Sequence, residues 1–427
     1  MKLLVIRNHL KAHAALLTFL LKHKFNIKTE MKKIIITSAL LAAAVVSNAA
    51  PLVTIGDQLD LFFKGAVVGK WDSNITYSSD SGTAPGSRKY NDFSTIIRLG
   101  AEADYGRNSK FKANVKFYED LTRYADYKEF NSNLAHVAAT ASYTETVFSV
   151  KANFSFNQNF QNSSTTTAAM LAGELVRSNA WNANLTGSYD FSDKIFGELG
   201  GNWMYNEYLG KWASLYSDYN VFGIPVSVLY RVTPKISVGL TYQYRYTTFS
   251  GGDYLSTLLY GDTRDDHFGG VTLRGDILPK LAASIYAGVT YREMNNALIE
   301  SDADTTFALG ANLSYELTEK VVLFANGRRD FGNGASRQSS IDSGCEVGAN
   351  YFLNQFISLV TSFAYTNSEY MGMDRNDNEY IGRIGVSYSP NKFIKIATNY
   401  RFLDNSSNVS SACYNQHVVD ISVSLKY

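Results

Sequence analysis

The chain has 427 residues, enough for one large domain or two to three ordinary ones, and its 29 Tyr, 25 Phe and only 6 Pro indicate an ordered, strand-rich protein. Residues 1–49 hold eight of the 40 basic residues and one of the 39 acidic ones, so the remaining chain has a net charge near −6 instead of +1. This balance excludes the basic face of a nucleic-acid-binding protein, and we expect no nucleic-acid partner.

The N-terminal residues have the features of a secretory leader. Met31-Lys32-Lys33 is a basic start, residues 34–46 are apolar, and Ser47-Asn48-Ala49 is a small-x-small cleavage signal. We expect cleavage after Ala49, with residues 31–49 as the signal peptide. Residues 1–30 are then either part of an unusually long leader or, as we expect, a stretch upstream of the true translation start. Residues 50–427 are expected to form a single barrel domain.

From about residue 58 onward, apolar and polar residues alternate in segments of ten to fourteen residues, a period typical of strands. Residues 236–246 place Ile, Val, Leu and Tyr on one face and Ser, Gly, Thr, Gln and Arg on the other, and residues 281–292 and 419–427 repeat this pattern. Soluble strands average about five to six residues, whereas crossing a bilayer at a tilt takes about nine to eleven. After the leader no apolar run is long enough for a membrane-spanning helix, so a membrane role would have to come from strands.

Short and long connections alternate between the expected strands. Eight tight turns fall near residues 106–109, 144–145, 192–194, 233–235, 278–280, 318–320, 353–355 and 389–392. Nine longer polar stretches lie near residues 79–92, 125–130, 161–175, 209–217, 250–264, 295–303, 333–340, 371–378 and 404–416. With both chain ends on the turn side, this count predicts about 18 strands.

The predicted fold is therefore all-β: a transmembrane antiparallel up-and-down β-barrel with short periplasmic turns and longer external loops. Closure is the physical reason, because lipid offers no hydrogen bonds to an open sheet edge. A soluble propeller or β-helix is the alternative suggested by the period of about forty residues. A soluble sandwich would also alternate, but its strands would be shorter, with polar outward faces and packed inner ones.

The end of the sequence resembles the assembly signal of outer-membrane barrels, with Val423, Leu425 and Tyr427 on one strand face and an aromatic residue last. The chain also resembles the putative β-barrel porin type 2 family. The resemblance rests on residues 106–110, 118–124, 233–235, 266–268 with 274–275, 317–320 with 329–332, and 385–392, in that order. It implies a pore in the outer membrane of a Gram-negative cell, with no catalytic residues and no cofactor. Some members of the family are associated with polysaccharide export.

Alternation also predicts which side chains line a wet lumen. The charged residues on the polar strand faces are Lys112, Lys116, Glu198, Arg245, Arg274, Arg292, Asp330, Glu346, Arg383, Lys395, Arg401 and Asp420. Rings of charge influence which solutes pass a pore. Basic residues outnumber acidic ones in this set, which favours a weak preference for anions. The alternative is that these are wall residues that hydrogen-bond across strands.

We find no catalytic or metal-binding motif. Asp265-Asp266-His267 could be compared with the Asp/His pair of a barrel protease, but we interpret it as a solvated acidic loop. Residues 374–379 lack the regular spacing of a calcium loop, and we interpret them as a hydrated loop facing lipopolysaccharide. Cys345 and Cys413 could form one disulfide or stay unpaired.

The favoured function is a non-enzymatic porin for passive diffusion of small hydrophilic solutes. The alternatives are a conduit for polysaccharide export with periplasmic partners, a barrel protease or phospholipase, and a surface adhesin. The expected contacts are outer-membrane lipid, lipopolysaccharide and the barrel-assembly machinery. No loop is long enough to suggest a deep constriction inside the lumen.

Overall fold

The computed structural model of the protein describes residues 51–56, 58–79, 89–162, 175–252, 254–297, 303–334 and 337–427. The expected leader and its cleavage site at Ala49 lie outside these residues. Within them, strands β2 to β19 each pair antiparallel with their chain neighbours, and β19 pairs back with β2. The described part of the chain thus forms a closed barrel of 18 strands with one extra short strand, β1, and the predicted all-β barrel is confirmed.

The 18 barrel strands are 13 to 18 residues long, so each exceeds the length needed to cross a bilayer. They are β2 (Leu59–Asp72), β3 (Asp92–Tyr105), β4 (Phe111–Tyr124), β5 (Ser132–Thr144), β6 (Phe148–Asn162), β7 (Leu175–Asp190), β8 (Ile195–Tyr208), β9 (Asp218–Thr233), β10 (Ile236–Ser250), β11 (Gly261–Leu278), β12 (Leu281–Ala297), β13 (Ala303–Thr318), β14 (Val321–Asn333), β15 (Ser339–Phe352), β16 (Ile357–Tyr370), β17 (Arg375–Tyr388), β18 (Ile394–Ser407) and β19 (Tyr414–Lys426).

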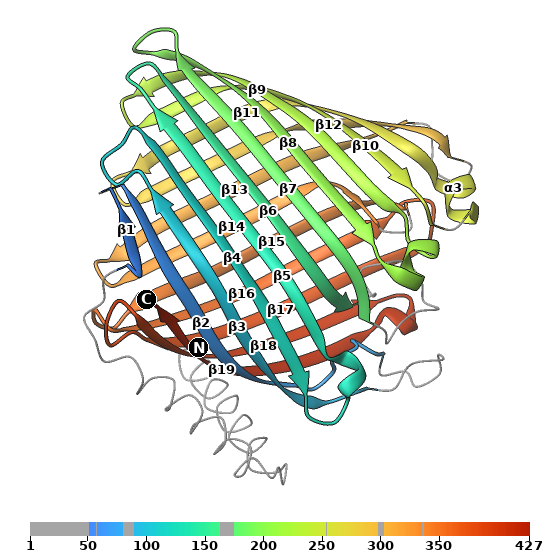
Figure 1. Ribbon diagram of the computed structural model, residues 1–427. Coiled ribbons are helices and arrows are strands. Elements are labelled where there is room, and N and C mark those ends of the chain that lie inside the picture. The colour runs from blue at the N-terminus through green and yellow to red at the C-terminus, as the bar shows by residue number, and fades with distance from the viewer. Residues whose placement is uncertain are drawn as a thin grey trace, which may run out of the picture. The chain divides into compact units, whose positions relative to one another are not determined.

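The remaining elements lie at the two ends of the barrel. Strand β1 (Val53–Ile55) pairs with the start of β2 at the end that carries the short turns. The short helices η1 (Lys128–Phe130), η3 (Gly210–Ser214), α3 (Tyr254–Tyr260) and η4 (Ser410–Ala412) lie in the longer loops at the other end. Figure 1 shows β1 and α3 at these opposite ends, with the strands running obliquely between them. No helix in the described residues is long and apolar enough to cross a membrane.

The barrel closes along the β2–β19 seam. The register runs from Val418 opposite Asp72 to Lys426 opposite Lys64. Tyr427 extends the ladder, since its N–H donates to the carbonyl oxygen of Phe63 at 2.9 Å and its own carbonyl accepts from the Phe63 N–H at 2.6 Å. Closure pairs the backbone groups that would otherwise form two open edges in lipid.

The outer face of the barrel is apolar and accessible. Leu240 is 69% exposed, Leu199 61% and Val232 58%, although each lies in or at the end of a regular strand. A contiguous apolar surface of this extent is unusual for a soluble protein and is what acyl chains would cover.

The inner face is identified by contacts between strands that are not neighbours. Arg245 on β10 reaches Asp330 on β14, and Arg274 on β11 reaches Glu198 on β8. Side chains separated by two or more intervening strands can meet only where they converge on the concave side of a closed sheet. Polar and charged residues therefore face inward, and the apolar residues between them face outward.

This polarity predicts the outcome of moving a charge from one face to the other. We expect Leu240→Arg on the outer face of β10 to destabilise the barrel by about 2–4 kcal/mol, because the charge must enter hydrocarbon. Gln243→Arg on the inner face of the same strand is the control and should cost much less. Denaturant unfolding in phospholipid vesicles measures both. Equal costs would contradict the assignment of the two faces.

Candidate functional site

The candidate site is the inner face of the barrel. All twelve residues that alternation selected lie on it. Residues that are paired across neighbouring strands point to the same side of the sheet, and the strand pairing links each of the twelve to the inward residues described above. Lys112 and Lys116 lie on β4, Glu198 on β8, Arg245 on β10, Arg274 on β11, Arg292 on β12, Asp330 on β14, Glu346 on β15, Arg383 on β17, Lys395 and Arg401 on β18, and Asp420 on β19. Their part in transport stays a prediction.

Most of the inward arginines are neutralised by carboxylates. Arg274 donates to Glu198 at 2.6 Å, and Arg383 donates to Glu346 at 3.1 Å. Arg401 donates to the side-chain oxygen of Gln416 at 2.7 Å. A count of basic against acidic residues therefore overstates the positive field of the lumen, because paired charges largely cancel at a distance.

The most deeply buried charges form a network centred on Asp266. One oxygen of Asp266 accepts from Nε of Arg292 at 2.6 Å, and the other accepts from Arg292 Nη2 at 2.9 Å and Arg245 Nε at 2.6 Å. Arg245 also donates to Asp330 at 3.1 Å. Asp266 is 2% exposed and Arg292 is fully buried. Charges this buried are tolerated only when they are paired and hydrogen-bonded.

This network corrects the interpretation of residues 265–267 as a solvated loop. They lie in β11, where alternation sends Asp266 inward and its two neighbours outward. Asp265 accepts a hydrogen bond from the hydroxyl of Tyr244, and Nδ1 of His267 lies 2.8 Å from the hydroxyl of Tyr242. Asp266 and His267 thus face opposite sides of the wall and cannot form a catalytic pair.

The network is buried because the end of the β14–β15 hairpin leaves the wall. Toward the loop end, strand β13 stays paired with β12 as far as Ala303. On its other side it pairs with β14 only as far as Leu309, which lies opposite Arg329. Strand β14 nevertheless continues to Asn333, paired with Ser339 of β15. The described end of this hairpin, residues 331–334 and 337–339 (here the hairpin tip), has therefore separated from β13.

The hairpin tip folds inward and packs on the inner face of β11 and β12. Arg292 donates to the carbonyl oxygen of Gly332 at 3.0 Å and to Ser339 at 3.2 Å, and its guanidinium lies 4.6 Å from the ring centre of Phe331. Arg264, also fully buried, donates to Asn333 at 2.8 Å.

Arg337 then ties the hairpin tip to two neighbouring loops. It donates to Ser217 at 2.8 Å and to the carbonyl oxygens of Gly251 and Gly261 at 2.9 and 3.1 Å. The sequence suggested no loop long enough to form a deep constriction. The structure brings the described end of the β14–β15 hairpin onto the inner face of the barrel.

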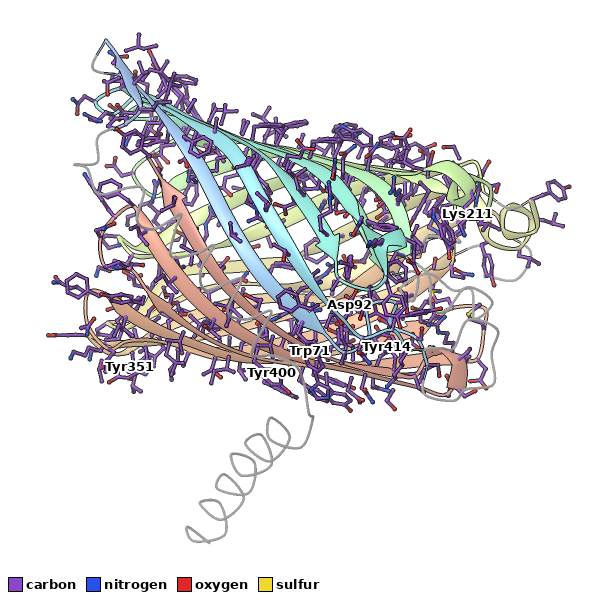
Figure 2. The ribbon with its side chains drawn as sticks, turned by 60° about the horizontal axis from the view of Figure 1, so that its bottom comes forward. Trp71, Asp92, Lys211, Tyr351, Tyr400 and Tyr414 are labelled. Atoms are coloured by element: carbon purple, nitrogen blue, oxygen red, sulfur yellow. The ribbon has the colours of Figure 1, made fainter. Side chains whose placement is uncertain are left out.

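A second segment, Ser73–Ser79, is buried on another side of the loop end. The side chain of Asn74 is inaccessible, donates to the carbonyl oxygens of Ser78 and Asn415 at 3.0 Å each, and accepts from the Ser78 N–H at 2.9 Å. Gln416 of β19 donates to Asp72 and to the Asn74 carbonyl. Figure 2 marks this region with Trp71, Asp92 and Tyr414, and it places Lys211 and Tyr351 at opposite ends of the barrel. Two segments are thus packed against barrel residues at the loop end.

Three further features singled out in the sequence can be compared with the structure. Residues 375–379 form the start of β17 rather than a hydrated loop, and Arg375 pairs with Asp377 at 2.6 Å. No group of three or more His, Cys, Asp or Glu side chains within the described ranges is arranged to hold a metal ion. Cys345 and Cys413 are both free thiols.

Sequence reasoning missed several inward charges. Alternation alone would have selected Lys64, Lys151 and Arg264, which share the inner face with the residues named above. Arg337 could not have been found in this way, because it lies in a loop. The expected assembly-signal residues, Val423, Leu425 and Tyr427, lie on the outward side of the β2–β19 seam.

A closed barrel with an apolar exterior and a charged interior defines a transmembrane β-barrel with a polar lumen. The model of the family described as "Putative beta-barrel porin 2" matches residues 66–427, and the chain belongs to this family. No curated protein matches the chain in sequence.

Several solved structures are similar in fold. OccK9 (OpdG) of Pseudomonas aeruginosa has 11% sequence identity and a TM-score of 0.47, over 86% of this chain and 99% of that one. OpdK of Pseudomonas aeruginosa, solved with vanillate, has 7% identity and a TM-score of 0.46 over the same shares. The ferric citrate transporter FecA has 10% identity and a TM-score of 0.42, over 89% of this chain and 80% of that one.

The buried network predicts a large difference between two arginine substitutions. Arg292→Met leaves Asp266 short of a partner in a buried site, so we expect a loss of about 3–5 kcal/mol. Arg383→Met is the matched control, because Arg383 and Glu346 are 44% and 29% exposed and such a pair contributes about 0–1 kcal/mol. Denaturant unfolding in lipid or detergent compares the variants. Similar losses would show that the hairpin tip is not held by this network.

Proposed function

We propose that the protein is a passive pore for small hydrophilic solutes in the outer membrane of a Gram-negative cell. Its membership of a porin family supports this proposal. The observation that carries it is the charged inner face of a closed 18-strand barrel, because at this strand number the lumen is too wide to be filled by side chains alone.

The hairpin tip would set the narrowest part of this pore. It occupies the lumen at the loop end, and its backbone is held by Arg292 and its loop by Arg337. Segment Ser73–Ser79 narrows the same end from the side of β19. A solute entering from outside would meet these segments before it reached the turn end.

The enzymatic alternatives receive little support. Asp266 and His267 lie on opposite faces. His136, the histidine around which a Ser-His-Asn lipase arrangement could be imagined from the sequence, stacks on Tyr118 with its Nδ1 3.0 Å from Asn157. The polysaccharide conduit uses the same barrel, and no described contact favours it over diffusion of small solutes.

Liposome swelling with sugars of increasing size tests the pore. We expect proteoliposomes to admit monosaccharides and to exclude sugars above a defined size. Absence of any sugar uptake and of any single-channel conductance by a folded barrel would refute the proposal.

A shortened hairpin tests the constriction. We expect replacement of residues 332–340 by Asn-Gly, a two-residue turn that leaves Phe331 opposite Ile341, to raise both the single-channel conductance and the size limit. Shortening the loop at residues 372–374, where Asp374 accepts hydrogen bonds from Asn408 of the β18–β19 loop, is the control and should change neither. The shift of the unboiled barrel on gel electrophoresis reports folding of each variant. Unchanged conductance in a folded hairpin variant would place the constriction elsewhere.

A further inference from the structure

Three exposed lysines on one wall of the lumen have no ion-pair partner within the described residues. Lys112 and Lys116 lie on β4 and Lys151 on β6, all on the inner face. Lys112 and Lys151 lie opposite Ser142 from its two sides, so one strand separates them. That places their backbones about 10 Å apart, and Lys116 is four residues, about 13 Å, further along β4. We call these three residues the lysine wall.

The surroundings of the lysine wall are also basic. Lys64 and Lys426 share the carboxylate of Glu102, which leaves one positive charge in excess there. Asp60 is paired with Arg107 of the adjacent turn. The other nearby inward carboxylates are Asp120, which is paired with Arg98, and Asp104, which lies opposite Asn114 between Lys112 and Lys116. Strand β5, between β4 and β6, contributes no inward carboxylate.

The lysine wall differs in this respect from the arginines elsewhere in the lumen. Arg245 and Arg292 are paired with Asp266, and Arg274 is paired with Glu198. The charge of each of those guanidinium groups is balanced by a nearby carboxylate. The ammonium groups of the lysine wall instead face the lumen with donors still available to a solute.

We propose that the lysine wall binds solutes that carry two or more negative charges, and that it gives the pore a preference for them. The inference rests on the proposed pore function and names the substrate class of that same lumen. Long flexible lysine side chains can converge on one anion from three backbone positions. Binding in a wet lumen is weak and screened by salt, which suits a pore because the solute must also leave.

The magnitude follows from Coulomb attraction. One ammonium about 4 Å from a charged oxygen in water strengthens binding about fivefold, so two simultaneous contacts strengthen it about 30-fold at low salt. A monovalent anion can use only one such contact at a time. The preference should therefore be larger for a multivalent anion than for chloride.

The experiment compares two triple variants in planar bilayers. Lys112, Lys116 and Lys151 are changed together to Gln in the first. Lys194, Lys280 and Lys320, which are exposed in periplasmic-side turns, are changed to Gln in the second as a control with the same change in charge. The probes are the reversal potential in a KCl gradient and the reduction of chloride current by inorganic pyrophosphate at low ionic strength.

In the unmodified protein and in the turn variant, we expect anion preference and block by pyrophosphate. In the lysine-wall variant, we expect cation preference or none, and at least a tenfold higher pyrophosphate concentration for half block. Equal behaviour of the two variants would overturn the inference, as would cation preference in the unmodified protein. Either result leaves an ion-conducting pore, whereas the absence of conductance would refute the pore itself.

Discussion

Every feature of this protein depends on the closure of the sheet between β19 and β2. In hydrocarbon, an unpaired N–H or C=O costs several kcal/mol, so a single open edge along a strand of this length would outweigh the stability of an ordinary domain. The ladder from Val418 and Asp72 to Tyr427 and Phe63 removes that edge. Once the sheet is closed, the alternation of apolar and polar side chains along each strand fits only one arrangement. The apolar side chains face outward and the polar side chains face inward.

Closure also creates the lumen, and the lumen changes what charged residues do. On an open sheet, Arg245 and Asp330 would be separated by three strands. On the concave side of the barrel they meet at 3.1 Å. The same convergence brings Arg274 to Glu198. Side chains that read along the sequence as free charges of a channel wall therefore become a cross-linked network on the side formed by β8 to β14. The wall formed by β4 to β6 instead keeps the exposed Lys112, Lys116 and Lys151, so charge pairing is distributed unevenly around the inner face.

The hairpin tip illustrates a balance between wall and lumen. If it stayed in the wall, residues 330–333 would continue the ladder with β13 from the pair Leu309 and Arg329. Instead the tip gives up those backbone hydrogen bonds and gains contacts to Arg264, Arg292 and the loops around Ser217 and Gly251. The exchange is possible at the loop end, where the freed edge of β13 can be hydrated. It would not be possible in the middle of the membrane.

The sequence by itself determined the strand number, the order of turns and loops, and the inward or outward direction of every predicted wall residue. All three follow from local features of the sequence, namely the two-residue alternation of apolar and polar side chains and the residues typical of turns. It could not reveal that Asp266 is buried. That burial depends on Arg292, which binds Asp266, and on Gly332, which lies forty residues after Arg292 and contacts it from the hairpin tip. Nor could it separate the neutralised Arg274 from the solvated Lys112. Pairing across a lumen is decided by the curvature of the closed sheet, and curvature is a property of the tertiary structure alone.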